Sequence, residues 1–119
     1  MTQKTYLDSH AQRFTLNDNG IVKNGTKDIP INELEVLTAK GFIESCCKKL
    51  RHKNTKGFSY KLKHSAESWG EEINKITGKN IFSKYVSNGA FIKAAQEMGF
   101  IVYRIDNSLN CYFNMSVKR

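Results

Sequence analysis

Residues 83–116 combine a helix-forming stretch with two strand-forming stretches directly after it, and this order limits the folds open to the chain. Ser87 can cap a helix through its hydroxyl, and the apolar residues after it recur at helical spacing over 87–98. The segments 100–105 and 111–117 are rich in β-branched and aromatic residues and are separated by a polar turn. The stretch therefore predicts a short helix followed by a β-hairpin.

Two further helices are predicted upstream. Apolar residues over 59–76 step alternately by four and three positions, which is typical of an amphipathic helix. An earlier helix is predicted to begin at Asn32, with Glu35 three residues on as in a capping box, and to continue to about Arg51. Residues 51–58 are polar and contain a glycine, so we expect a loop there.

The N-terminal part of the chain is predicted to form a hairpin after a loose end. Residues 1–11 show no period and are expected to be loosely held. Asn19 and Gly20 stand between apolar segments, which is a strong short-range hairpin signal. A second turn is expected at Asn24 and Gly25, before the first helix.

The positive charge of the chain is concentrated in one segment. The formal net charge is +8, and residues 48–63 hold seven bases and no acid. Such a block gains from contact with a polyanion that releases counterions, so it predicts a nucleic-acid-binding surface. The alternative is a solvated segment that keeps the protein in solution. The bases of this block are Lys48, Lys49, Arg51, Lys53, Lys56, Lys61 and Lys63.

The order of helix, connection, helix and hairpin resembles a winged helix-turn-helix, with one departure. The connection over 77–86 is longer than the turn of about three or four residues usual in that motif. The length of 119 residues predicts one domain, and the predicted elements give a winged-helix-like α+β fold over 1–119, with about three helices and a β-hairpin at each end. The resemblance implies that the helix over 87–98 enters the major groove and that the hairpin lies along the backbone. The residues expected to contact nucleic acid there are Asn88, Lys93, Gln96 and, in the hairpin, Arg104.

A second resemblance concerns the source of the chain. The segments SYKLKH, YVSNGAFIKAA, GF and CYFN look like those of small uncharacterised proteins carried by bacterial phages and plasmids. Two functions are consistent with this resemblance. The first is a nucleic-acid-binding module, a small phage- or plasmid-type regulator, with DNA favoured over RNA. The second is a mobile-element protein that binds and inhibits a host defence or nucleic-acid-processing protein, with its basic face on an acidic surface.

Aromatic residues of the C-terminal hairpin leave one question open. Tyr103 and Tyr112 would suit single-stranded nucleic acid if they lay on an exposed strand beside Lys and Arg. The alternative is that they fill the core of a small sheet. Strand alternation alone does not assign their faces.

Other classes of function are not favoured by the sequence. The one compact acid–base pair is His64 with Glu67, which lacks the second His of H-E-x-x-H and any Gly-rich phosphate loop. Three cysteines in no zinc-ligand spacing predict free thiols in a reducing compartment. No apolar run is long enough for a membrane span or a signal peptide. We therefore expect a cytoplasmic protein that is not an enzyme and has no metal, cofactor or membrane partner.

Overall fold

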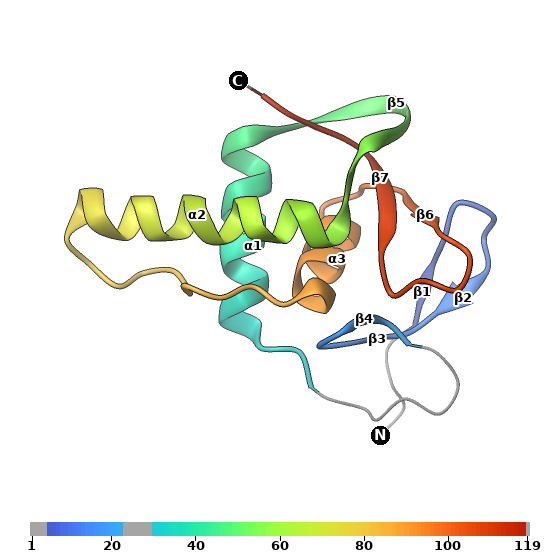
Figure 1. Cartoon of the computed structure of the whole chain (residues 1–119), viewed down its shortest axis with the longest axis horizontal. Coiled ribbons are helices and arrows are strands. Elements are labelled where there is room, and N and C mark those ends of the chain that lie inside the picture. The colour runs from blue at the N-terminus through green and yellow to red at the C-terminus, as the bar shows by residue number, and fades with distance from the viewer. Residues whose placement is uncertain (1–4, 23–29, 119) are drawn as a thin grey trace.

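Helices and small antiparallel sheets make up the computed structural model, which describes residues 5–22 and 30–118 and confirms the α+β class. In Figure 1 the longer helices lie to the left and most of the strands to the right. The predicted turn at Asn24 and Gly25 lies outside the described residues. The elements are β1 (Tyr6–Leu7), β2 (Arg13–Phe14), β3 (Leu16–Asn17), β4 (Gly20–Ile21), α1 (Glu33–Cys46), β5 (Cys47–Phe58), α2 (Ser59–Thr77), α3 (Asn88–Glu97), β6 (Val102–Arg104) and β7 (Cys111–Val117).

The N-terminal hairpin is confirmed, and the segment before it is more ordered than expected. β3 and β4 pair antiparallel, with Asn17 opposite Gly20 across the predicted turn. β1 pairs with β2, and the rings of Tyr6 and Phe14 stack with their centroids 5.7 Å apart. The expected loose end is therefore wrong for Tyr6–Leu7, because burial of these aromatic rings holds that segment against the fold.

The first helix begins as predicted but ends earlier. The Asn32 side chain accepts hydrogen bonds from the backbone N–H groups of Leu34 and Glu35, at 2.9 and 3.2 Å, which confirms the cap. The Glu35 carboxylate does not close a capping box with Asn32 and instead accepts a hydrogen bond from the N–H of Ser87, at 2.8 Å. α1 ends at Cys46, and not near Arg51, because Cys47 leaves helical geometry and starts a strand.

The segment expected to be a helix end and a loop is the edge strand β5. The three-stranded sheet has the order β5-β7-β6, with both pairs antiparallel. Cys47 to Lys49 pair with the end of β7, and the register then shifts before Asn54 and again before Phe58. These bulges remove the alternation that marks a regular strand, so pairing with β7, some 60 residues away, decides a conformation that local pattern does not.

The core is centred on α3, which confirms the predicted helix and its Ser87 cap, whose hydroxyl oxygen accepts a hydrogen bond from Ala90 N–H. Seven of the ten α3 residues are buried. The Phe91 ring lies between Phe42 of α1, with centroids 6.3 Å apart, and Phe113 of β7, at 5.7 Å. α2 crosses in front of α1 in Figure 1, and a Cβ at Gly41 would lie only 2.6 Å from the Trp69 ring. Close helix packing therefore depends on that glycine.

Side chains from the first two helices hold the connection between α2 and α3 in place. The buried Asn74 amide accepts from the N–H groups of Ile81 and Phe82 and donates to the Phe82 carbonyl. Further along, Thr38 Oγ1 accepts from Ser83 N–H at 2.9 Å. The connection is thus a fixed strap, because its backbone groups find partners on the helices beneath. None of the helices in the described ranges is long and apolar enough to span a membrane.

The first prediction concerns the contact between α3 and the β3–β4 turn. A Cβ at Gly89 would lie 1.7 Å from the Asn17 carbonyl oxygen, so Gly89→Ala must push the turn away from the helix. We expect a loss of roughly 3 kcal/mol in the free energy of unfolding, the upper end for overpacking. Urea denaturation measures it. Gly57→Ala is the control, because its new Cβ makes ordinary contacts at 3.6 Å or more, and an equal loss in both variants would contradict the prediction.

Candidate nucleic-acid interface

Most of the predicted basic residues lie along β5, the edge strand of the sheet. Lys48, Lys49, Arg51, Lys53 and Lys56 are exposed, and Lys61 is exposed in the first turn of α2. The bulge between Lys49 and Asn54 makes the chain project there, since four residues of β5 oppose one of β7. β5 carries no acidic residue. The structure thus brings six of the seven predicted basic residues together along the β5 edge of the sheet and the first turn of α2.

Three aromatic residues form a row across this sheet. Tyr112 of β7 is the direct partner of Phe58 on one side and of Tyr103 on the other. Direct partners in antiparallel strands point to the same face, so the three side chains share one face. The neighbours of Tyr112 in β7, Cys111 and Phe113, are buried in the core on the opposite face. We call Phe58, Tyr112 and Tyr103 the aromatic row.

The aromatic row is accessible and lies next to a cation. Phe58 is 36% exposed, while Tyr103 and Tyr112 are half-buried. The Lys53 ammonium lies 6.0 Å from the centroid of the Tyr103 ring. The row therefore combines the two groups that single-stranded nucleic acid binds, namely ring faces and positive charge. Sequence reasoning assigned Phe58 to a loop and missed it, because the bulges of β5 hide the register that places it beside Tyr112.

Two predicted cations lie away from the row. The guanidinium of Arg104 lies 5.9 Å from the Phe14 ring, and Arg104 pairs with buried Cys111, on the face opposite the row. Lys49 reaches over the Phe100 ring, with its ammonium 5.3 Å from the centroid. Both residues place their charged groups near rings of the fold, and Arg104 is not part of the same surface as Lys53.

Lys63 is not a surface cation, contrary to the prediction. It is only 4% exposed, and its ammonium lies 3.1 Å from Glu67 Oε2. The rings of Tyr60 and Tyr85 lie on its other sides, with their centroids 5.1 and 4.6 Å from Nζ. A buried ammonium needs such compensation, since desolvation of an isolated charge is costly.

The three α3 residues predicted to contact nucleic acid are used within the fold. Asn88 is buried, and its amide donates to the carbonyls of Asn19 and Leu109 at 3.0 and 3.2 Å. Lys93 pairs with Glu33 at 2.7 Å, a hydrogen bond that raises the pKa of Lys93. Gln96 donates to the Leu7 carbonyl at 3.0 Å. This placement does not support groove reading by α3, because the helix that looked amphipathic in sequence is covered by the N-terminal segment as well as by the core.

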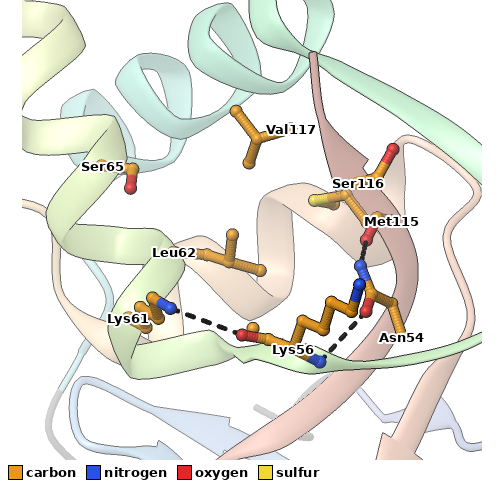
Figure 2. Close-up of a pocket in the computed structure, with 9 residues that line it drawn as sticks. Asn54, Lys56, Lys61, Leu62, Ser65, Met115, Ser116 and Val117 are labelled. Carbon is orange, nitrogen blue, oxygen red and sulfur yellow. Dashed lines mark hydrogen bonds between the residues drawn. The ribbon is translucent and has the colours of Figure 1, made fainter. Parts of the chain in front are cut away.

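A pocket of about 320 Å³ opens beside the basic strand, between the second half of β5, α2 and the end of β7 (Figure 2). Leu62 and Val117 point into it, and Lys56 and Lys61 contribute the charges of its described lining, which includes no acid. Asn54 fixes the bend of β5, since its amide donates to the Met115 carbonyl and accepts from Lys56 N–H. The pocket extends the positive surface of β5 onto α2.

The acid–base pair noted in the sequence does exist, but it serves the fold. Glu67 accepts hydrogen bonds from Lys63, from Val86 N–H at 2.9 Å and pairs with His64 Nδ1 at 2.9 Å. Burial alone would raise the pKa of Glu67, but these hydrogen bonds outweigh it and lower that pKa. The carboxylate thereby joins α2 to the strap before α3.

The three cysteines are free thiols, as predicted. Burial raises the pKa of Cys47 to about 12 and also raises that of Cys111. These thiols are therefore poor nucleophiles at neutral pH. Among the described residues, no group of three His, Cys, Asp or Glu side chains is placed to hold a metal ion.

Comparisons of the chain with protein-family models, curated proteins and solved structures find no match. The chemistry of its own surface, above all the aromatic row beside the basic strand, is what indicates function.

The second prediction concerns the pH dependence of Glu67. Its pKa is lowered in the folded state, so its contribution to stability is present above the unfolded value near 4.5 and is lost as the pH falls through the folded pKa. Glu67→Gln leaves the Lys63 ammonium without its counter-charge and should lower the free energy of unfolding at pH 7 by about 2 kcal/mol. Urea denaturation at pH 7 and pH 3.5 should show the gap closing. Glu71→Gln is the matched control, because Glu71 is exposed and meets Lys75 only at 3.7 Å. A gap as large at pH 3.5 as at pH 7 would contradict the assignment.

Proposed function

We propose that the protein binds single-stranded nucleic acid on the face of the three-stranded sheet that carries the aromatic row. One observation carries the proposal. Phe58, Tyr112 and Tyr103 are direct neighbours across three strands, and the exposed basic residues of β5 lie on the strand that carries Phe58. Phage- or plasmid-type regulation remains the biological setting that the sequence suggests, with DNA favoured over RNA.

Stacking and counterion release would supply the binding energy. A base stacked on an aromatic side chain contributes about 1 to 3 kcal/mol and tolerates any sequence, since every base has a π-face. Phosphates that follow Lys48, Arg51 and Lys53 would release counterions, which makes affinity depend on salt. The row provides the first contribution and the projecting bulge of β5 the second, so one strand of nucleic acid can use both.

A duplex fits this surface less well. In a duplex the bases are stacked on one another, so their faces are not open to an aromatic row. Reading through the major groove needs an exposed element such as a helix, and α3 has seven of its ten residues buried. The geometry therefore favours an unpaired strand over the duplex that the winged-helix resemblance suggested.

Ring removal is the direct test of the proposal. Tyr103→Leu and Tyr112→Leu keep apolar bulk but remove the ring, so each should weaken binding of a fluorescein-labelled ten-residue oligothymidine by roughly tenfold. Tyr103→Phe and Tyr112→Phe keep the ring and should bind like the parent protein. Fluorescence anisotropy measures the affinities, and circular dichroism confirms that each variant is folded. Equal affinity of the Leu variants and the parent would refute the proposal.

Salt dependence separates binding to nucleic acid from docking on a protein. Changing Lys48, Arg51 and Lys53 together to Gln should make the slope of log affinity against log salt shallower by about 2, at about 0.7 per phosphate contact on a single strand. The matched control changes Lys75, Lys79 and Lys84, which are exposed at the far end of α2 and in the strap. The same measurement with oligouridine and with a duplex tests the preference for DNA and for one strand. No binding tighter than about 10 μM near 50 mM salt would reject the proposal and favour an acidic host protein as the partner of β5.

A further inference from the structure

A second pocket, of about 220 Å³, lies where five segments meet, and no part of the proposed sheet surface uses it. Its walls come from the β3–β4 turn, the first turn of α2, the end of the strap, the start of α3 and the turn before β7. It adjoins the aromatic row: Tyr60 in its wall comes two residues after Phe58, and Asn110 comes two residues before Tyr112. The pocket therefore lies beside the end of the sheet that carries Phe58 and Tyr112.

One buried acceptor in the wall of the pocket has no donor. Asn88 is 6% exposed, and both of its hydrogen bonds leave from Nδ2, toward the carbonyls of Asn19 and Leu109. These two acceptors fix the orientation of the amide, because a flipped amide would face them with its oxygen. Oδ1 is buried and has no partner among the described residues. A buried acceptor of this kind costs free energy until a donor reaches it.

The other walls supply a second acceptor, a donor and flat faces. Asp18, in the β3–β4 turn, adds a carboxylate that only accepts. The Lys63 ammonium keeps N–H donors beyond the one directed at Glu67. Tyr60 and Tyr85 flank that ammonium and are 48% and 52% exposed. The residues that line the pocket thus include two acceptors, one cationic donor and two rings.

We propose that this pocket binds a guanine base. Guanine alone among the common bases carries two adjacent donors, N1–H and the N2 amine, next to the acceptor O6 on one edge. The donors match Asn88 Oδ1 and the Asp18 carboxylate, and O6 matches the Lys63 ammonium. Adenine would present its N1 acceptor to the carboxylate, and thymine and cytosine have no pair of adjacent donor positions. The source of the base is either a free nucleotide or a strand on the sheet, and the second case rests on the proposed function.

The experiment compares oligonucleotides that differ in one base. Ten-residue oligothymidine is measured against the same strand with guanine or adenine at either end, by fluorescence anisotropy. We expect a guanine-ended strand to bind about tenfold tighter than oligothymidine, as for one well-made base contact, and an adenine-ended strand to bind like oligothymidine. Equal tightening by adenine and guanine would mean stacking without reading and would overturn the proposal.

Variants assign the preference to the pocket. Asp18→Asn turns an acceptor into a group that also donates, and it should reduce the guanine preference to about twofold or less. Asp106→Asn is the matched control, because Asp106 is an exposed acid in the β6–β7 turn and its loss changes the net charge equally. Tyr85→Leu, at a half-exposed position, should also reduce the preference. A preference unchanged in Asp18→Asn would overturn the assignment.

Experiments with free nucleotides distinguish failure of the pocket proposal from failure of the strand-binding proposal. Guanosine monophosphate should shift the side-chain amide resonances of Asn88 in a ¹H–¹⁵N spectrum, and adenosine monophosphate at the same concentration should not. Shifts with guanosine monophosphate but no oligonucleotide binding would keep the pocket and reject the strand-binding surface. Oligothymidine binding without guanine preference and without Asn88 shifts would keep the surface and reject the pocket.

Discussion

The seating of the β3–β4 turn on the start of α3 is the contact on which the rest of the structure depends. Gly89 N–H donates to the Asp18 carbonyl at 3.1 Å, and only a residue without Cβ fits so close to the Asn17 carbonyl. Asn88, the residue before it, joins the same turn to Leu109 in front of β7. One end of one helix thereby fixes the N-terminal hairpin, the core helix and the C-terminal hairpin relative to each other, and all three contribute to the wall of the pocket of about 220 Å³.

Polar side chains of α1 and α2 hold the strap in one conformation, as a tight turn does in shorter helix–helix units. Thr38, Asn74 and Glu67 each accept a backbone N–H from the segment between α2 and α3. A free connection of that length would leave its backbone to solvent and allow α3 to shift. Glu67 also pairs with Lys63, whose ammonium lies beside the rings of Tyr60 and Tyr85. One carboxylate therefore both holds the strap and balances the charge between these rings.

Local signals were sufficient for the helix starts and for the extent of α2 and α3, and insufficient for the end of α1 and for β5. The Asn32 and Ser87 caps and the period of α2 are short-range patterns, and the structure confirms all three elements. β5 has no regular alternation of buried and exposed residues, because its two bulges interrupt it. Its pairing partner, β7, lies some 60 residues further along the chain. The same limit applies to the site. A polar residue such as Asn88, off the apolar stripe of its helix, looks exposed in sequence. Its burial depends on the β3–β4 hairpin that covers it, in which its partner Asn19 lies 69 residues earlier. The aromatic row was equally hidden, because Phe58 joins it through a register that no local spacing reveals.

The basic edge strand has two explanations that the aromatic row separates. Lysines along an edge strand protect it from pairing with another chain, which accounts for the charge of β5 without any ligand. That explanation concerns the edge alone and makes no demand on the sheet face. Phe58, Tyr112 and Tyr103 lie on the face, and protection of the edge does not account for three neighbouring rings there. The proposed binding of nucleic acid would use the charge at the edge and the rings on the face together, so the rings, rather than the lysines, are the residues that decide between the two explanations.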